Sequence, residues 1–304
     1  MAKDIIVLLG GKSAEREVSL VSGEACAVAL ESKGHKVRRV DPNSDLADWV
    51  KLLIPKPDVV FNALHGQYGE DGRVQGVLDL LGIPYTHSGV AASALAMDKV
   101  RAKKILQTVG MPVAKDKSYT LDALKTLDKD PFERPFVLKP LSEGSSVGVY
   151  IFAENKNISV QDVANQESSE LWMAEEFLCG KELTVAVRDG EALAVTEIKP
   201  STEFYDFEAK YTDGITQHIL PATVDKSVET EVKRLAVLAH ETLGCRGISR
   251  SDFKLDQHGK PVYLETNTQP GMTPLSLVPE QAQFIGIDFA DLVDWIVDSA
   301  VCDA

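Results

Sequence analysis

Residues 1–90 alternate short β-rich runs with amphipathic helical patterns, and this alternation constrains the fold more than any other feature of the chain. Helical patterns at residues 19–33 and 45–53 separate three apolar runs, "DIIVLL", "HKVRRV" and "DVVFNAL", and another such pattern follows at residues 74–81. Strands that are separated by single helices pair in parallel through right-handed crossovers. The sequence therefore predicts a Rossmann-like α/β unit at the N-terminus.

Two polar loops leave the expected carboxyl ends of these strands, where parallel sheets collect their ligands. The first loop, "GGKSAEREVS", contains a Gly-Lys-Ser and suggests a phosphate-binding P-loop. A P-loop needs a glycine five residues before that triplet, and Ile6 occupies the position. We therefore expect residues 10–19 to anchor a small polar ligand instead. The second loop, "HGQYGEDG", follows the third strand.

After residue 110 the pattern changes to one typical of antiparallel sheet. A single long helix is expected at residues 90–109, and helices are also predicted at residues 228–243 and 289–300. Between them lie strand-like runs with period-two alternation, namely "FVLKP", "VGVYIF", "WMAEEFL", "ELTVAV", "ALAVTEI", "GISRSDFKL" and "PVYLET". The chain is thus expected to be α/β at first and α+β in its C-terminal part, with boundaries near Ala94 and Gly180.

Composition limits the partners. The 304 residues carry a net charge of −14, which repels nucleic acid and anionic membrane surfaces. No apolar run is long enough for a membrane span, and the N-terminus enters a strand-like run without a signal peptide, so we expect a cytoplasmic protein. The four cysteines are scattered without any C-x-x-C, which fits incidental reduced thiols.

The segment "SDFKLDQHGKPVYLETNTQPG" has the strongest pattern of candidate ligands. Asp252 lies in one predicted strand, and Glu265 and Asn267 lie on one face of the next. A turn at residues 258–260 would fold the two strands into a hairpin and bring the three side chains together. Such oxygen donors suit Mg²⁺ that holds phosphates. The alternative is that they are solvated residues on a sheet face; carboxylates within apolar strands favour the metal.

Two lysines could supply positive charge. Lys139 ends the strand "FVLK" beside the loop "EGSSVG", where a lysine can meet phosphates under the N–H groups of a loop. Lys99 lies on the expected long helix, where most lysines are simply exposed. Arg250 shares the face of Asp252 and could stabilise an oxyanion or clamp a carboxylate.

The segment "EEFLCGKE" follows a strand and could be a hinge that binds a nucleotide. Glu175 and Glu182 would then lie near the adenine amino group and the ribose hydroxyls. An ordinary strand end with charged residues facing solvent explains the segment equally well.

In this order, Lys99, Lys139, "EGSSVG", "EEFLCGKE", "EAKY", "SRSDF" and "ETNTQPGMT" resemble the D-alanine:D-alanine ligase family, whose members have the ATP-grasp fold. The similarity runs from "GGKSAEREVSL" to the closing helix, and "HGQYGEDG" together with "LETNTQPGMTPLSL" is its most specific part. The resemblance implies a Rossmann-like substrate domain at residues 1–94 and a central ATP-grasp subdomain at residues 95–180. Residues 181–304 would form a C-terminal ATP-grasp subdomain with the metal site and a lid loop.

The resemblance also implies a role for each matching residue. Catalysis would use Glu15, Ser145, Tyr211, Arg250 and Gly271, the last through its backbone N–H. The substrates would contact Glu15, His65, Lys210, Ser276 and Leu277. ATP would contact Lys99, Lys139, Glu175, Leu178 and Glu182, and Asp252, Glu265 and Asn267 would bind two Mg²⁺ or Mn²⁺ ions.

The implied reaction joins two D-alanines through an acyl phosphate, at the expense of ATP, for peptidoglycan synthesis. A homodimer is implied as well, and the polar segment at residues 201–216 would be the lid that excludes water. Lys210-Tyr211 favours a dipeptide product over a depsipeptide. Lys254 departs from the family pattern, because an apolar residue is expected to line the adenine pocket there; its aliphatic stem could fill that role.

Other functions fit less well. Another carboxylate-amine ligase of the same fold would share these residues and differ in substrate. A regulatory nucleotide-binding module without catalysis would be expected to lack a metal ligand or the arginine, and none is missing. A dehydrogenase is disfavoured because no G-x-G-x-x-G follows the first strand.

Overall fold

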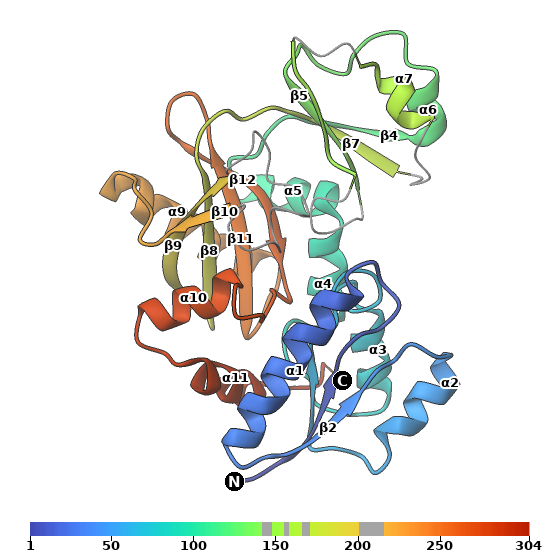
Figure 1. Ribbon diagram of the computed structural model, residues 1–304. Helices are drawn as coiled ribbons and strands as arrows, with labels where there is room; N and C mark the ends of the chain where they lie inside the picture. The colour runs from blue at the N-terminus through green and yellow to red at the C-terminus, as the bar shows by residue number, and fades with distance from the viewer. Residues whose placement is uncertain (142–147, 155–157, 166–170, 201–215, 304) are drawn as a thin grey trace.

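The computed structural model describes residues 1–141, 148–154, 158–165, 171–200 and 216–303, and the strands within them form three sheets (Figure 1). The first sheet lies at the bottom of the view in Figure 1, the five-stranded sheet above it, and the four-stranded sheet at the top. The order along the chain is first sheet, four-stranded sheet, five-stranded sheet. The chain therefore passes through the top before it returns to the middle.

The first sheet is parallel, as the alternation predicted. It has the order β2-β1-β3 and consists of β1 (Asp4–Leu8), β2 (Lys36–Val40) and β3 (Val59–Asn62). Residues Ile5 to Leu8 are fully buried, because successive side chains of β1 enter hydrophobic clusters on opposite faces of the sheet. One cluster includes α1 (Arg16–Ser32); the other includes η1 (Val50–Leu53), α3 (Arg73–Leu80) and the end of α2 (Leu46–Trp49).

The last helix of the chain completes this N-terminal core. Helix α11 (Phe289–Asp298) lies beside α1 (Figure 1) and buries Leu292 and Ile296 in the same cluster as Ile5. Polar side-chain contacts join it to the N-terminal part: Lys3 to Asp298 at 2.7 Å, His35 to Asp294 at 2.7 Å, and Lys33 to Asp291. Helix α11 falls within the predicted C-terminal subdomain. It nevertheless packs beside α1, in the hydrophobic cluster of the first sheet.

The four-stranded antiparallel sheet has the order β4-β7-β5-β6. Its strands are β4 (Asp116–Thr120), β5 (Phe136–Pro140), β6 (Tyr150–Phe152) and β7 (Leu171–Glu176). The short helices α6 (Leu121–Lys125) and α7 (Val160–Ala164) cover one face around Phe136 and Phe152, whose rings stack at 4.6 Å. This sheet forms a small lobe with its own core.

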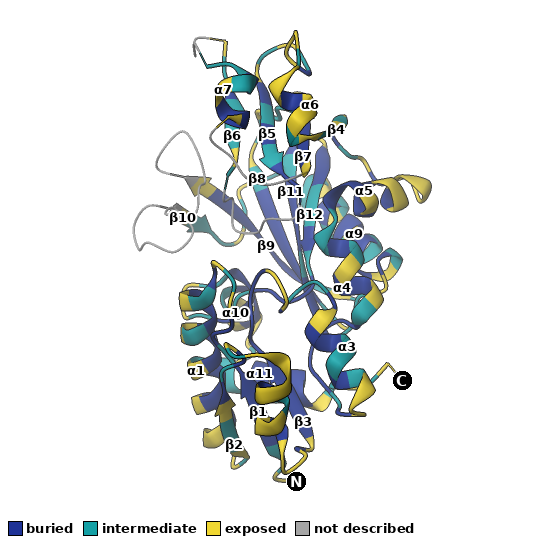
Figure 2. Cartoon of the chain, turned by 90° about the vertical axis from the view of Figure 1, so that its right-hand side faces the viewer, coloured by how far each residue is buried: buried dark blue, intermediate teal, exposed yellow. Residues whose placement is uncertain are grey.

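The five-stranded antiparallel sheet has the order β10-β9-β8-β11-β12. Its strands are β8 (Glu182–Arg188), β9 (Glu191–Pro200), β10 (Thr216–Ile219), β11 (Ile248–Leu255) and β12 (Pro261–Asn267). Helix α9 (Lys226–Thr242) packs on one face, and α10 (Leu277–Phe284) packs toward β8 and β9. In Figure 2 strands β8 and β11 are largely dark blue, which marks this sheet as the buried centre of the molecule.

The expected long helix at residues 90–109 is wrong: two helices, α4 (Val90–Met97) and α5 (Lys99–Thr108), occupy the segment. Asp98 separates them with a non-helical backbone (φ −87°, ψ 91°), and its carboxylate accepts a 3.0 Å hydrogen bond from the backbone N–H of Arg101. An aspartate at this position caps the next helix. The break makes Lys99 the first residue of α5.

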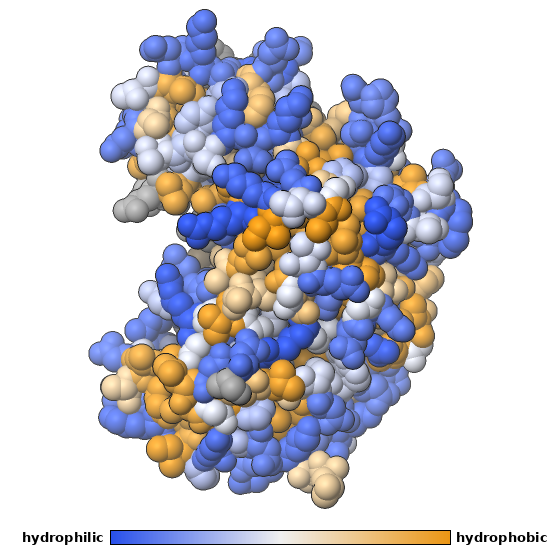
Figure 3. All heavy atoms as spheres, turned by 180° about the vertical axis from the view of Figure 1, so that it is seen from behind, coloured by the Kyte–Doolittle hydropathy of each residue, from blue (hydrophilic) through white to orange (hydrophobic). Residues whose placement is uncertain are grey.

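Across the residues that the structure describes, no helix combines the length and apolar character needed to span a bilayer. Figure 3 shows the face seen from behind, where hydrophilic residues dominate and hydrophobic residues gather in patches between them. The division into three domains stays a prediction; the three sheets fall within the three predicted ranges, whereas α11 crosses them by packing on the first sheet.

We predict that Asp98→Ala lowers the free energy of unfolding by about 1 kcal/mol, the usual cost of losing a helix N-cap. Urea denaturation followed by circular dichroism measures the effect. Asp98→Asn keeps a capping oxygen and is the matched control. Equal stability of the wild type and the alanine variant would contradict the capping role.

Candidate active site

A pocket opens where the loops of the first sheet face the five-stranded sheet. Glu15, His65 and Glu70 line it from the N-terminal loops. From the other side it is lined by Ile198, His218, Arg250, Asp252, Glu265, Asn267, Gln269, Pro270, Gly271, Thr273, Leu275, Ser276 and Leu277. The pocket therefore collects residues from both ends of the chain.

The predicted oxygen ligands lie together on the β11–β12 hairpin. Asp252 stands opposite Glu265 in the strand register, and Arg250 stands opposite Asn267. The amide nitrogen of Asn267 lies 3.5 Å from Oδ2 of Asp252. Two carboxylates and an amide on one patch match the hard oxygen donors that Mg²⁺ prefers, so the residues fit this ion. Their role as metal ligands stays a prediction.

Cations already surround these carboxylates. Arg250 holds Asp252 with two hydrogen bonds of 2.9 and 2.7 Å, and the hydroxyl of Thr184 donates to the same carboxylate at 2.6 Å. Nζ of Lys99 lies 3.3 Å from Glu265. The helix break at Asp98 places Lys99 at the start of α5, beside Glu265, and its predicted contact with ATP stays a prediction. Two positive side chains, those of Arg250 and Lys99, thus lie beside the carboxylates of the hairpin.

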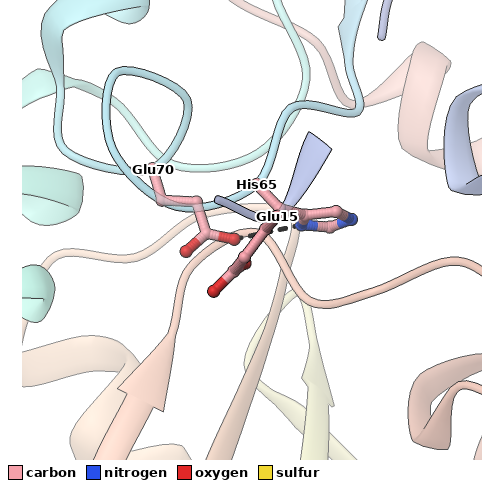
Figure 4. Close-up of side chains that lie close together, drawn as sticks. All are labelled: Glu15, His65 and Glu70. Atoms are coloured by element: carbon pink, nitrogen blue, oxygen red, sulfur yellow. Dashed lines mark hydrogen bonds and ion pairs between the residues drawn. The ribbon is translucent and has the colours of Figure 1, made fainter. Parts of the chain in front are cut away.

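Glu15, His65 and Glu70 converge on the opposite side of the pocket (Figure 4). One ligand atom from each lies within 4.8 Å of the others, and Glu15 and His65 are buried. Nδ1 of His65 lies 3.1 Å from Glu70 and Nε2 lies 3.2 Å from the hydroxyl of Ser22, so the ring orientation is set from both nitrogens. Two carboxylates beside an imidazole suit a cationic group such as an ammonium.

The backbone N–H groups of the two glycines in the first loop donate to side chains of the same chain. The N–H of Gly10 donates to Ser19 Oγ and the N–H of Gly11 donates to Asp41, both at 2.9 Å. Both glycines have positive φ, 83° and 75°, which favours glycine at this turn. Both backbone donors are therefore bonded to side chains of the protein itself, which agrees with the rejection of the P-loop.

Sequence reasoning missed a buried amide network that joins the two sides of the pocket. Asn62, at the end of β3, donates to the side-chain oxygen of Gln269 at 2.7 Å and to the carbonyl of Gly69 at 3.0 Å. Gln269 in turn donates to the carbonyl of Leu64. Both amides are buried. Gln269 stands within the quoted motif "ETNTQPG", but its long-range partners carry no local signal.

The segment after β12 presents Gly271, Ser276 and Leu277 to the pocket. Ser276 precedes α10, and its hydroxyl accepts a 2.9 Å hydrogen bond from the N–H of Thr273. A Cβ at position 271 would lie 2.9 Å from this hydroxyl, so glycine leaves the room that the turn needs. The N-terminus of α10 therefore faces the pocket, where it favours a negative group.

Lys139 and Glu175 lie together in the four-stranded sheet. Nζ of Lys139 is 2.9 Å from one oxygen of the buried Glu175 carboxylate, and the other oxygen accepts a 2.7 Å bond from Lys103. Burial opposes ionisation of Glu175, but the two lysines outweigh it and hold its pKa below the ordinary value. The predicted adenine contact of Glu175 stays a prediction, and Lys103 is a residue that the sequence did not single out.

The hinge after β7 contains Leu178, which is half-buried, and Glu182, which begins β8. Lys254 lies beside them: its Nζ is 3.8 Å from Glu182 and 5.4 Å from the centre of the Phe177 ring. A lysine over an aromatic ring is a favourable arrangement, and it explains how a charged residue is accommodated where an apolar one was expected. Three other predicted site residues, Ser145, Lys210 and Tyr211, lie outside the described residues, as does nearly all of the expected lid at residues 201–216.

Two family models match the chain: one described as the N-terminus of D-ala D-ala ligase, over residues 50–88, and one described as its C-terminus, over residues 105–298. The chain is 50% identical to a D-alanine–D-alanine ligase of Parvibaculum lavamentivorans over 99% of both chains, and 49% identical to one of Agrobacterium fabrum over 99% of this chain and 98% of that one. The chain belongs to the D-alanine–D-alanine ligase family. The resemblance inferred from the motifs is confirmed.

Solved structures of this ligase family share the fold. The ligase of Bacillus anthracis is similar with a TM-score of 0.82 at 32% identity, over 98% of this chain and 97% of that one, and a structure of it complexed with ATP gives the same TM-score at 31% identity. The VanG D-Ala:D-Ser ligase of Enterococcus faecalis is similar with a TM-score of 0.79 at 28% identity, over 98% of this chain and 99% of that one. The predicted ATP-grasp fold and the assignment to ATP-dependent ligases are thereby confirmed.

We predict that Glu265→Gln reduces turnover by more than about 100-fold, because changes even to residues behind metal ligands cost 10- to 100-fold. Coupled detection of ADP or phosphate measures the rate, and the thermal midpoint serves as a control for folding. Near-normal turnover of the glutamine variant would exclude Glu265 as a metal ligand.

Proposed function

We propose that this ligase joins two D-alanines to D-alanyl-D-alanine, a peptidoglycan precursor, with conversion of ATP to ADP and phosphate. The observation that carries the proposal is the composition of one pocket. A site for an ammonium at Glu15, a cluster of oxygen ligands at Asp252 and Glu265, and a helix N-terminus at Ser276 all open into it. Identity of about half over the full length to D-alanine–D-alanine ligases supports the same substrates.

Asp252, Glu265 and Asn267 would hold two Mg²⁺ or Mn²⁺ ions with the phosphates of ATP. When bound, such ions neutralise charge on the transferred phosphoryl group. Lys99, beside Glu265, and Lys139 would contact the same phosphates, while Leu178 and Glu182 would lie along the adenine and ribose. These roles are assigned from the matching motifs and the positions of the side chains.

In the first step Glu15 would hold the ammonium of the first D-alanine, with His65 beside its carboxylate. A carboxylate is a poor electrophile, so its oxygen attacks the γ-phosphorus of ATP, the bond to ADP breaks, and an acyl phosphate forms. The lysines would balance the charge that moves to the leaving ADP. Ser145 and Tyr211 would close the site above Glu15.

In the second step Ser276 and Leu277, at the N-terminus of α10, would hold the carboxylate of the second D-alanine together with Lys210. Its neutral amine attacks the acyl carbon, the carbon–oxygen bond to phosphate breaks, and the proton that the nitrogen loses leaves with the phosphate. Arg250 and the N–H of Gly271 would stabilise the tetrahedral oxyanion; losing one such donor typically costs about 10²- to 10³-fold in rate. A homodimer acting in the cytoplasm completes the proposal, as the family resemblance implies.

We expect phosphate release to require ATP, a divalent cation and D-alanine together, and chelation with excess EDTA to abolish it reversibly. A panel of second substrates, D-alanine, D-serine, D-lactate and L-alanine, identifies the acceptor. Release that continues without D-alanine would refute ligation. A faster rate with D-serine or D-lactate would keep the ligase but replace the proposed acceptor.

A further inference from the structure

Lys103 is the most deeply buried charged side chain near the predicted nucleotide site. It lies on α5, is only 1% exposed, and its ammonium has three close acceptors. These are the carbonyl of Ala114 at 2.8 Å, Oε1 of Glu175 at 2.7 Å and Oδ1 of Asp116 at 3.0 Å. A lysine has three N–H donors, so Lys103 has none left for a ligand. Any effect of Lys103 on a ligand must therefore pass through its partners.

Glu175 connects Lys103 to Lys139, one of the predicted ATP contacts. Each oxygen of its carboxylate takes one lysine, Lys103 on one side and Lys139 on the other. With Asp116 the group contains two positive and two negative charges, which allows it to be buried. Lys139 differs from Lys103 in that its side chain is 13% exposed and has Glu175 as its partner. Of the two lysines, Lys139 is the one that can exchange its partner for a ligand.

Lys139 can leave Glu175 for a ligand only if another cation neutralises the buried carboxylate. When Lys139 turns toward a phosphate, the buried Glu175 loses half of its compensation, and a buried carboxylate without a cation is strongly unfavourable. Lys103 meets the requirement because it stays in contact with Glu175. Helix α5 also carries Lys99, four residues earlier on the same side, which reaches Glu265 in the other sheet.

We propose that Lys103 is a positioning residue for ATP: it keeps Glu175 neutralised from behind, so that Lys139 can leave that carboxylate and bind the nucleotide phosphates. The proposal rests on the ATP-dependent function proposed above. Its specific consequence is that Lys103 controls the affinity for ATP without touching it and has no effect on the affinity for D-alanine.

The test is the affinity for ATP with Mg²⁺ and without D-alanine, measured by isothermal titration calorimetry. Lys103→Met should weaken binding at least about tenfold, or about 1.4 kcal/mol, while the KM for D-alanine stays within twofold of the wild type. Lys104→Met, which removes an exposed lysine from the adjacent position of the same helix, is the matched control and should bind ATP normally. An ATP affinity of Lys103→Met within twofold of the wild type overturns the proposal.

A change at Asp116, the third partner of Lys103, separates positioning from simple support of the fold. Asp116→Asn should lower the thermal midpoint but leave ATP affinity unchanged, because Glu175 keeps both lysines. A loss of ATP affinity in Asp116→Asn as large as in Lys103→Met would overturn the proposal.

Should Lys103→Met fail to fold, Lys103→Gln, which removes the charge but keeps a donor, takes its place with the same expected loss and the same overturning result. Failure of the wild type to bind ATP would refute the proposed function itself. Normal binding by the wild type together with unchanged binding by the Lys103 variants would refute the positioning role alone.

Discussion

The contact between Gln269 and the loop after β3 is the interaction on which the pocket depends. Among the described residues, the N-terminal sheet and the five-stranded sheet have no strand in common, so hydrogen-bonded strands do not hold the two sides of the pocket together there. Gln269 joins the two sides through its buried amide, whose oxygen accepts a hydrogen bond from Asn62 and whose nitrogen donates one to the carbonyl of Leu64. Buried amides of this kind are costly unless every partner is in place. These side-chain bonds, together with the hydrophobic cluster that Ile5 shares with Ala186 and Ile248, therefore fix the two sides of the pocket relative to each other.

The positive side chains near the predicted site are paired with carboxylates of the chain. Arg250 and Lys99 each contact a carboxylate of the β11–β12 hairpin, and Lys139 contacts Glu175. In a protein with a net charge of −14, these local pairs offer a polyanion the cations it needs. Each pair lies in a partly desolvated setting, where charge interactions are stronger than in water. The same groups thus hold the neighbouring carboxylates and, in the proposed function, would offer positive charge to the incoming substrates.

Much of the fold and of the hairpin site could be predicted from the sequence because the signals are local. Asp252, Glu265 and Asn267 follow the two-residue period of their strands, and a Gly-containing turn joins them. Lys103 carried no such signal, since it has the same residue type as the exposed Lys104 beside it and its partner Glu175 is 72 residues away. Gln269 lies 205 residues from Leu64. The prediction of one long helix at residues 90–109 failed for another reason. The apolar pattern continues through Asp98, but the side chain of Asp98 caps a new helix there.

The packing of α11 on the first sheet has a consequence for folding during synthesis of the chain. Strand β3 ends at residue 62, but α11, which shares a core with β1, begins only at residue 289. At translation speeds of about 5–20 residues per second, roughly 10 to 45 seconds separate their synthesis. During that interval α1 can pack on the first sheet but lacks its contact with α11. The hydrophobic core around the first sheet is thus complete only after the last helix of the chain has been synthesised.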